Sequence, residues 1–291
     1  MYETVKSERF RDLLANERLR LFSEQYITES YMDCAPDHAD AIQVLLSQAF
    51  SELAAASHDS QNFAFAIRYV VDEIFQKHDP DFWFNRLYLE YKHRLKPHRY
   101  IEYLRPWLIG NRILDLGCGN GLTAWHLAQA GYEVGLTDIL DYRAAEARGL
   151  PFVLIGDARS LSYSNGIFDT GILLSVLHHV VAEDLVPLLR ELQRVCRHRL
   201  VIEEDTFALP SDLEGLADVL SQDPQLRNFM FLSEEDQLRY TMFLDYFGNV
   251  VTQGLFEMEI PFEFKPFSEW KTFFSEQGFR IANVIVRGFQ K

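Results

Sequence analysis

The sequence has 291 residues, 48% of them hydrophobic, which is enough for one α/β core with about a hundred residues to spare. Its 43 acidic and 28 basic side chains give a net charge of -15. Because such a surface repels a phosphate backbone, it argues against nucleic acid as a partner. No apolar run approaches the roughly 18 residues that a membrane-spanning helix needs, and the segment from Met1 to Arg11 is charged rather than apolar. We therefore expect a cytoplasmic protein without a membrane partner.

Three cysteines lie far apart in the sequence, at Cys34, Cys118 and Cys196. Their odd number and the absence of a C-x-x-C pair argue against a disulfide framework and against a cysteine zinc site.

Residues 1–108 predict a helical N-terminal or cap region, because apolar side chains recur there at helical spacing, first over 42–53 and then over 63–74. The sequence His78-Asp79-Pro80 interrupts this pattern, and a further helix is expected over 88–107. Aromatic residues are dense over 63–107 and 229–274. They predict either ordinary helix packing or an apolar substrate chamber.

From Arg112 onward, short apolar strands alternate with helices, which is typical of a parallel, doubly wound α/β sheet of the Rossmann-like kind. The expected helices are 122–130 and 185–195, the second with Pro187 in its first turn. The expected strands are 112–116, 133–137, 152–155, 170–174 and 200–202.

The chain after residue 205 divides into an insertion and a C-terminal part. The expected domains are therefore the helical region 1–108, the Rossmann-like core 109–205, the helical insertion 206–266, and the C-terminal helix and strand of the core over 267–291. The insertion is acidic, with helices expected over 211–221 and 233–247, and it is too long for a plain crossover loop. We expect it to cover the active site as a lid. The last part predicts a helix over 267–277, stopped by Gly278, and a strand over 282–286.

The segment Ile113 to Gly121 (ILDLGCGNG) predicts a strand running into a glycine-rich loop that opens a helix. Free backbone amides and the positive end of the helix dipole meet a ligand at such a loop. The dinucleotide pattern G-x-G-x-x-G would require a third glycine at position 122, which is Leu122. Asp115 lies where a carboxylate would repel a pyrophosphate but attract a cationic amino group, so a sulfonium amino-acid cofactor fits better.

Two further carboxylates follow the next expected strands. Asp138 closes the second strand, where it can accept hydrogen bonds from ribose hydroxyls, and Asp157-Ala158 closes the third, within reach of an adenine amino group. Three acidic residues at three successive strand ends are more specific than a glycine motif alone.

These stretches, ILDLGCGNG, TDI, IGDARSL and FDTGILLSVLHHV, resemble in order and spacing the motifs of class I S-adenosylmethionine-dependent methyltransferases. The resemblance is strong over 112–205 and looser over 262–286. It implies a cofactor site for S-adenosyl-L-methionine in which each part of the ligand has its own residues. These are Asp115, Gly117, Cys118 and Gly119 for the methionine end, Asp138 and Ile139 for the ribose, Asp157 and Ala158 for the adenine, and Leu174 and Ser175 for the sulfonium.

In one respect the sequence departs from this family, whose members usually finish with a strand hairpin. Only about five residues follow Val286 here, so the final strand is expected to be missing, to come from 256–264, or to be supplied otherwise.

Two histidines, His178 and His179, follow the fourth expected strand, beside the expected methyl position. They are the candidate catalytic residues, with His178 as a general base. A structural role in the loop is an alternative, and a metal site with Glu203, Glu204 or Asp205 is another, although no metal is part of the prediction. The candidate substrate-binding residues are Tyr88, Tyr91, His98, Glu204 and Tyr246.

Together these observations predict a methyltransferase that acts on a small, partly apolar metabolite, with oxygen as the expected methylated atom. Methylation of carbon or nitrogen, and a noncatalytic module that binds the same cofactor, remain alternatives. A homodimer is compatible with the prediction.

Overall fold

A computed structural model of the chain describes residues 10–75, 79, 81–91, 95–156, 159–209, 211–212, 223–256, 258 and 260–287. The chain divides into two compact units. One is the continuous segment Leu89–Asp205, and the other joins Met1–Tyr88 with Thr206–Lys291. We call them the sheet unit and the helical unit.

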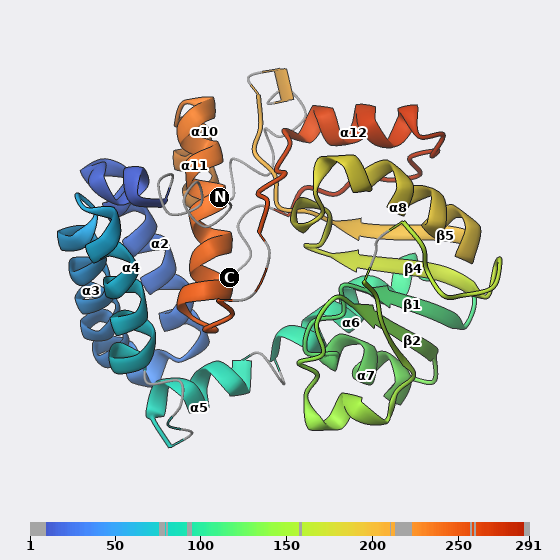
Figure 1. Ribbon diagram of the computed structural model, residues 1–291, viewed down its shortest axis with the longest axis horizontal. Coiled ribbons are helices and arrows are strands. Elements are labelled where there is room, and N and C mark those ends of the chain that lie inside the picture. The colour runs from blue at the N-terminus through green and yellow to red at the C-terminus, as the bar shows by residue number, and fades with distance from the viewer. Residues whose placement is uncertain are drawn as a thin grey trace. The chain divides into compact units, whose positions relative to one another are not determined.

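The sheet unit contains a five-stranded, all-parallel sheet with the strand order β3-β2-β1-β4-β5 (Figure 1). Each strand contains a short apolar segment, and the three central strands are largely buried, as a sheet covered on both faces requires. All five strands predicted from the sequence are confirmed. Their bounds are β1 (Arg112–Leu116), β2 (Glu133–Asp138), β3 (Phe152–Leu154), β4 (Phe168–Leu174) and β5 (Cys196–Glu203).

Helices cover both faces of this sheet. Helix α7 (Leu122–Gln129) connects β1 to β2, whereas α8 (Ala182–Val195) leads into β5 on the other side of β1. Because crossovers between parallel strands are right-handed, opposite directions along the sheet place the two helices on opposite faces, as Figure 1 shows. The remaining elements of this unit are α6 (Lys96–Leu104), η4 (Arg105–Trp107), η5 (Ala145–Gly149) and η6 (Leu177–His179).

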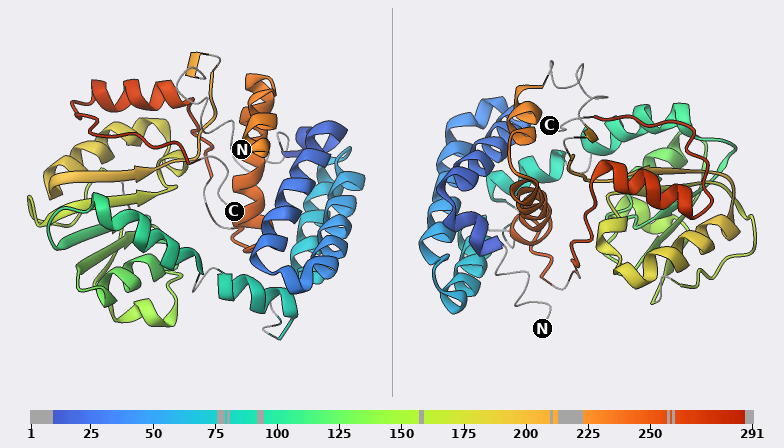
Figure 2. Two further views of the ribbon diagram at one scale, coloured as in Figure 1. Left: turned by 180° about the vertical axis from the view of Figure 1, so that it is seen from behind. Right: turned by 90° about the horizontal axis from the view of Figure 1, so that it is seen from above.

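In the helical unit, α2, α3 and α4 pack side by side, and α11 packs against α2 (Figures 1 and 2). These helices share one hydrophobic core, to which other segments of the unit also contribute. It includes the fully buried rings of Phe50, Phe63, Phe84, Tyr240 and Phe243. The aromatic density of the sequence is thus largely explained by helix packing. The bounds are α2 (Glu17–Cys34), η1 (Pro36–His38), α3 (Ala39–Ala56), α4 (Ser60–Tyr69), η2 (Val70–Ile74), α5 (Trp83–Glu90), α10 (Pro224–Met230), α11 (Glu234–Tyr246), η8 (Phe247–Val251) and α12 (Phe267–Glu276).

Three expectations about helices and strands are wrong. The single helix expected over 88–107 is two helices, because α5 ends at Glu90 and α6 begins at Lys96 with Pro97 in its first turn, where proline is tolerated. Pro187 lies inside α8 rather than in its first turn, since the helix already begins at Ala182. The strand expected over 282–286 is absent, and its residues make no strand pairing.

Other expected elements are confirmed, absent or outside the described residues. The helices expected over 233–247 and 267–277 are confirmed as α11 and α12, and Gly278 follows α12 with a positive φ of 81°. The described residues between 256 and 264 form no strand either. Most of the helix expected over 211–221 lies outside the described residues. Among the helices that the structure describes, none has the length and apolar character needed to cross a bilayer.

Candidate functional site

The candidate site lies where the strand order of the sheet reverses. Strand β1 has β2 on one side and β4 on the other, and the connections from these strands leave in opposite directions. In open parallel sheets, ligands bind beyond the carboxyl ends of the strands at this point. The carboxyl ends of β1, β2 and β4 are Leu116, Asp138 and Leu174.

The glycine loop, residues 117–121, joins β1 to α7 and folds over the end of β2. The amides of Gly117 and Cys118 both donate to the carbonyl oxygen of Thr137, at 2.8 and 3.2 Å. Gly117, Gly119 and Gly121 have positive φ values of 69°, 57° and 72°, a region that glycine adopts without strain. Glycine at these positions thus lets the loop turn sharply into the helix.

Gly117 also lies in close contact with the turn that follows β4. A β-carbon at position 117 would lie 2.5 Å from Cγ2 of Val176, which is closer than real side chains approach. The missing side chain is therefore required for the glycine loop and the turn to meet.

Asp115 lies near the end of β1 with its side chain in the interior. The residue is 2% exposed, and its Oδ2 atom has no hydrogen-bond partner among the described residues. Burial raises the pKa of this carboxyl to about 7, and the nearby charge of Asp138 adds to the rise. A buried carboxyl with an unsatisfied oxygen is expensive unless a ligand supplies a donor, so Asp115 fits a cationic group such as an amine.

Asp138 at the end of β2 is tied to the glycine loop. Its Oδ2 accepts from the amide of Gly119 at 2.8 Å, and its Oδ1 accepts from the amides of Ile139 and Leu140 at 2.7 and 3.2 Å. Burial raises the pKa of this carboxyl, and the three amides oppose the rise. A carboxylate offers about four acceptor positions, so these bonds leave one position, on Oδ2, for a ligand hydroxyl.

The end of β4 is strained. Ser175, which follows Leu174, has a φ of 56° although it is not glycine, and its amide donates to the carbonyl oxygen of Glu203 at 2.8 Å. Left-handed backbone at a non-glycine residue is uncommon and concentrates at functional sites. The strain occurs at the residue expected beside the methyl group.

The turn that follows Ser175 contains both candidate catalytic histidines. His178 is completely buried, and its Nδ1 lies 2.7 Å from Oε2 of Glu204. The other oxygen of Glu204 accepts from the amides of Val176 and Leu177. The rings of His178 and His179 are 4.2 Å apart, and His179 lies close enough to Asp138 to lower the pKa of that carboxyl.

The other candidate residues are placed as follows. Ile139 follows β2 and is 48% exposed, whereas Cys118 is buried in the glycine loop, where burial raises its pKa and keeps the thiol neutral. Asp157 and Ala158 lie outside the described residues. The structure thus brings together Asp115 of β1, Asp138 of β2 and the end of β4 with the glycine loop and the turn that follows Ser175.

The proposed substrate-binding residues are spread over both units. In the helical unit, Tyr88 and Tyr246 are half-buried and pack against the hydrophobic core. In the sheet unit, Tyr91 is half-buried and His98 is exposed on α6. Glu204 belongs to the turn described above.

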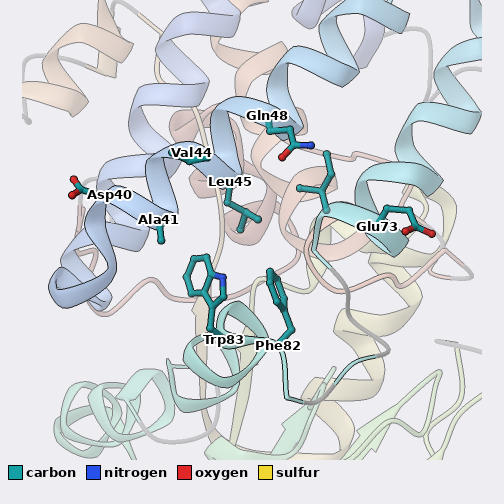
Figure 3. Close-up of a pocket in the computed structure, with 9 residues that line it drawn as sticks. Asp40, Ala41, Val44, Leu45, Gln48, Glu73, Phe82 and Trp83 are labelled. Atoms are coloured by element: carbon teal, nitrogen blue, oxygen red, sulfur yellow. The ribbon is translucent and has the colours of Figure 1, made fainter.

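A groove of about 540 Å³ on the helical unit contains none of these residues. Figure 3 shows Phe82 and Trp83 from the start of α5 facing Leu45 of α3 across it, while Asp40 and Glu73 lie at opposite ends. Its described lining is mainly apolar and includes no basic side chain.

One neighbour of the glycine loop is absent from the sequence-based prediction. The hydroxyl oxygen of Tyr142 lies 3.4 Å from the place that a β-carbon on Gly119 would occupy, and burial together with the charge of Asp138 raises the pKa of this phenol. The loop that contains it is held by the amide of Ala144, which donates to the carbonyl oxygen of Asn120. In the sequence, the only signal was a polar aromatic residue four positions after Asp138.

Comparison with known proteins gives one family match. Residues 114–200 match the model of a family described as "Methyltransferase domain". The match begins inside β1 and ends inside β5, so it contains the glycine loop, Asp138 and the two histidines. No curated protein matches the chain.

Several solved structures resemble part of the chain. A protein from Pyrococcus horikoshii is 28% identical over 43% of this chain and 63% of its own, with a TM-score of 0.32. A SAM-dependent methyltransferase from Archaeoglobus fulgidus is 25% identical over 50% of this chain and 66% of its own, with a TM-score of 0.36. A structure described as SAM-dependent methyltransferases from Methanosarcina mazei is 23% identical over 42% of this chain and 64% of its own, with a TM-score of 0.32. The chain thus spans less than two thirds of the length of each.

The matched segment coincides with the parallel sheet, its switch point and the buried acidic residues beside the glycine loop. Residues 114–200 are thus similar to methyltransferase domains, which agrees with the resemblance of the sequence motifs to class I S-adenosylmethionine-dependent methyltransferases.

Proposed function

We propose that this protein transfers a methyl group from S-adenosyl-L-methionine to an oxygen atom of a small, partly apolar metabolite. The observation that carries the proposal is the Asp115 carboxyl, which is buried beside the glycine loop with Oδ2 unpartnered among the described residues. A nicotinamide dinucleotide would bring a pyrophosphate, which carries no cation for this carboxylate. An amino acid with a cationic amino group supplies one.

Each part of the donor has residues that fit it. Asp115 would accept hydrogen bonds from the amino group, and the backbone of Gly117, Cys118 and Gly119 would lie along the methionine end. Asp138, with one acceptor position left on Oδ2, would accept a ribose hydroxyl next to Ile139. By the family resemblance, Asp157 and Ala158 would hold the adenine, and Leu174 and Ser175 would flank the sulfonium.

The bound cofactor supplies a methyl group that is already activated, so the main task of the protein is to hold the acceptor in line with it. Such positioning can contribute as much as about 7–11 kcal/mol. A hydroxyl acceptor must also lose its proton, and a positioned base accelerates this by roughly 10²–10⁴. We assign that role to His178 in the turn after Ser175, with His179 beside it.

For the acceptor, we propose a small molecule bound by polar side chains. The residues to test, each by its own substitution, are Tyr88, Tyr91, His98, Glu204 and Tyr246. The net charge of -15 makes nucleic acid an unfavourable acceptor. We place the reaction in the cytoplasm, and a homodimer is compatible with it.

Calorimetry and a transfer assay test the proposal together. S-adenosylmethionine should bind with 1:1 stoichiometry, whereas reduced nicotinamide cofactors should not bind. Incubation with a methyl-labelled donor and a panel of small alcohols, phenols, amines and carbon acids should label hydroxyl compounds. Absence of donor binding would disprove the site. Tight binding without transfer to any acceptor would favour a noncatalytic module instead, and labelled amines or carbon acids would disprove the oxygen assignment.

A further inference from the structure

We propose that Glu204 is a positioning residue: it sets the tautomer of His178 and holds the turn after β4 against the glycine loop. The inference rests on the proposed function for its catalytic consequence, but its structural part can be measured without any turnover.

The carboxylate of Glu204 joins three groups of one turn. Oε1 accepts from the amides of Val176 and Leu177, at 3.0 and 2.6 Å, and Oε2 lies 2.7 Å from Nδ1 of His178. Glu204 and His178 are both buried, with side chains 6% and 0% exposed. Little water competes for these bonds, so they define the local geometry strongly.

The bond to His178 determines which ring nitrogen carries the proton. Two backbone amides already donate to the same carboxyl group, which therefore acts as an acceptor in this turn. An ionised carboxylate is only an acceptor, so the proton in the short contact belongs to Nδ1, and the neutral imidazole then has its lone pair on Nε2. The turn thus presents His178 in the tautomer whose Nε2 can accept a proton.

The bonds to Val176 and Leu177 act on the other side of the site. Val176 contacts Gly117, where a β-carbon would lie 2.5 Å from its Cγ2. The same turn is closed by the amide of His179, which donates to the carbonyl oxygen of Val176 at 3.0 Å. By fixing this turn, Glu204 supports the wall against which the donor-binding loop packs.

These two actions can be separated by Glu204→Gln. A glutamine can keep its oxygen towards the two amides while its NH₂ group faces Nδ1 of His178 as a donor. The ring must then carry its proton on Nε2, which removes the basic nitrogen from that position. The turn keeps its backbone contacts, so donor binding should be preserved.

Glu203→Gln is the matched control. Glu203 precedes Glu204 at the end of β5, and its carboxylate accepts from the hydroxyl of Tyr100 at 2.8 Å. Glutamine can keep this bond, and both variants lose one negative charge at the same strand end.

The test combines nitrogen-15 NMR of the histidine rings with steady-state kinetics. The full-length protein should show His178 protonated on Nδ1, Glu204→Gln should show it protonated on Nε2, and Glu203→Gln should match the parent. We expect Glu204→Gln to lower kcat by roughly 10²–10⁴ with the KM for the donor changed less than threefold. Glu204→Ala should also weaken donor binding, because the turn loses its support.

The tautomer decides the proposal independently of activity. An Nε2-protonated His178 in the parent, or an unchanged tautomer in Glu204→Gln, overturns it. If the tautomer changes as expected while no variant, including the parent, transfers a methyl group, the positioning by Glu204 stands and the proposed function fails. If the tautomer changes and kcat does not, the assignment of His178 as base fails.

Discussion

Val176 contacts Gly117 so closely that a β-carbon on the glycine would lie 2.5 Å from its Cγ2 atom. Gly117 also has a positive φ of 69°. Gly117→Ala should therefore destabilise the protein twice, by about 1–2 kcal/mol for the left-handed backbone and by about 1–3 kcal/mol for the overpacked contact. It should also displace the loop and weaken donor binding. Urea unfolding and calorimetry measure the two effects.

Gly131→Ala separates the backbone effect from the contact. Gly131 has a φ of 97°, and a β-carbon there would meet nothing within 4 Å. Gly131→Ala should lower the free energy of unfolding only by the cost of the left-handed backbone, about 1 kcal/mol, and should bind the donor normally. Equal losses of stability in the two variants would mean that the contact with Val176 contributes nothing.

Asp115→Asn should stabilise the protein without ligand at alkaline pH. Burial raises the pKa of this carboxyl from its usual 3.8 to about 7 in the folded state. Below pH 4 the Asp115 carboxyl is protonated in both the folded and the unfolded protein, so the parent loses no stability. Between about pH 4 and 7 the unfolded chain ionises first, so the stability of the parent falls, by about 4 kcal/mol in total at roughly 1.4 kcal/mol per pKa unit. The asparagine avoids this loss.

The unfolding free energies of parent and variant should therefore differ most at pH 8 and converge at pH 4. A difference that does not change with pH would show that Asp115 has an ordinary pKa in the folded protein. Loss of donor binding in the same variant is expected at every pH.

Donor binding by the parent should release a proton near neutral pH. The amino group binds the ionised form of Asp115, whose pKa is about 7 without ligand, so affinity should fall by up to about tenfold for each pH unit below 7. Calorimetry in buffers of different ionisation enthalpy measures the released proton directly. A binding constant that stays level from pH 5 to 8 would contradict the pairing of Asp115 with the donor cation.

The alternation of apolar strands and helices was sufficient to predict the sheet, because each strand contains a short apolar run bounded by polar or glycine-rich residues. The pattern was less informative where local structure depends on tertiary partners. The segment 282–286 is rich in β-branched residues, as a strand would be, yet a strand requires a neighbouring ladder, and Val284 and Ile285 are exposed by 42% and 47%. Pro97, in the first turn of α6, is a signal in the sequence that divides the helix expected over 88–107.

The strand-end carboxylates could be predicted because β1 and β2 are adjacent and parallel, which brings Asp115 and Asp138 to one edge. Since β4 and β5 are also adjacent, Glu204 could be placed near His178, but its contacts could not be predicted, because only the fold shows that one oxygen meets Nδ1 of the ring and the other meets two amides. Tyr142 belongs to a loop without regular structure, for which the sequence offers no periodic pattern.

Asp138→Ala should abolish donor binding and also lower stability, because Asp138 is more than a ligand. Its carboxylate accepts from the amides of Gly119, Ile139 and Leu140, and the variant leaves these donors without their acceptor. Each lost bond to a charged group is worth about 1.5–3 kcal/mol at most, and water entering the space will recover part of it. We expect a net loss of about 1–3 kcal/mol together with a loose glycine loop. Asp141→Asn is the control, since Asp141 belongs to the same loop but its exposed carboxylate only pairs with Arg143, and solvent screening makes such a pair weak. Calorimetry should show no donor binding for the first variant and parent-like affinity for the second. Retained affinity in Asp138→Ala would move the ribose to another residue, whereas parent-like stability would show that the three amides find other acceptors.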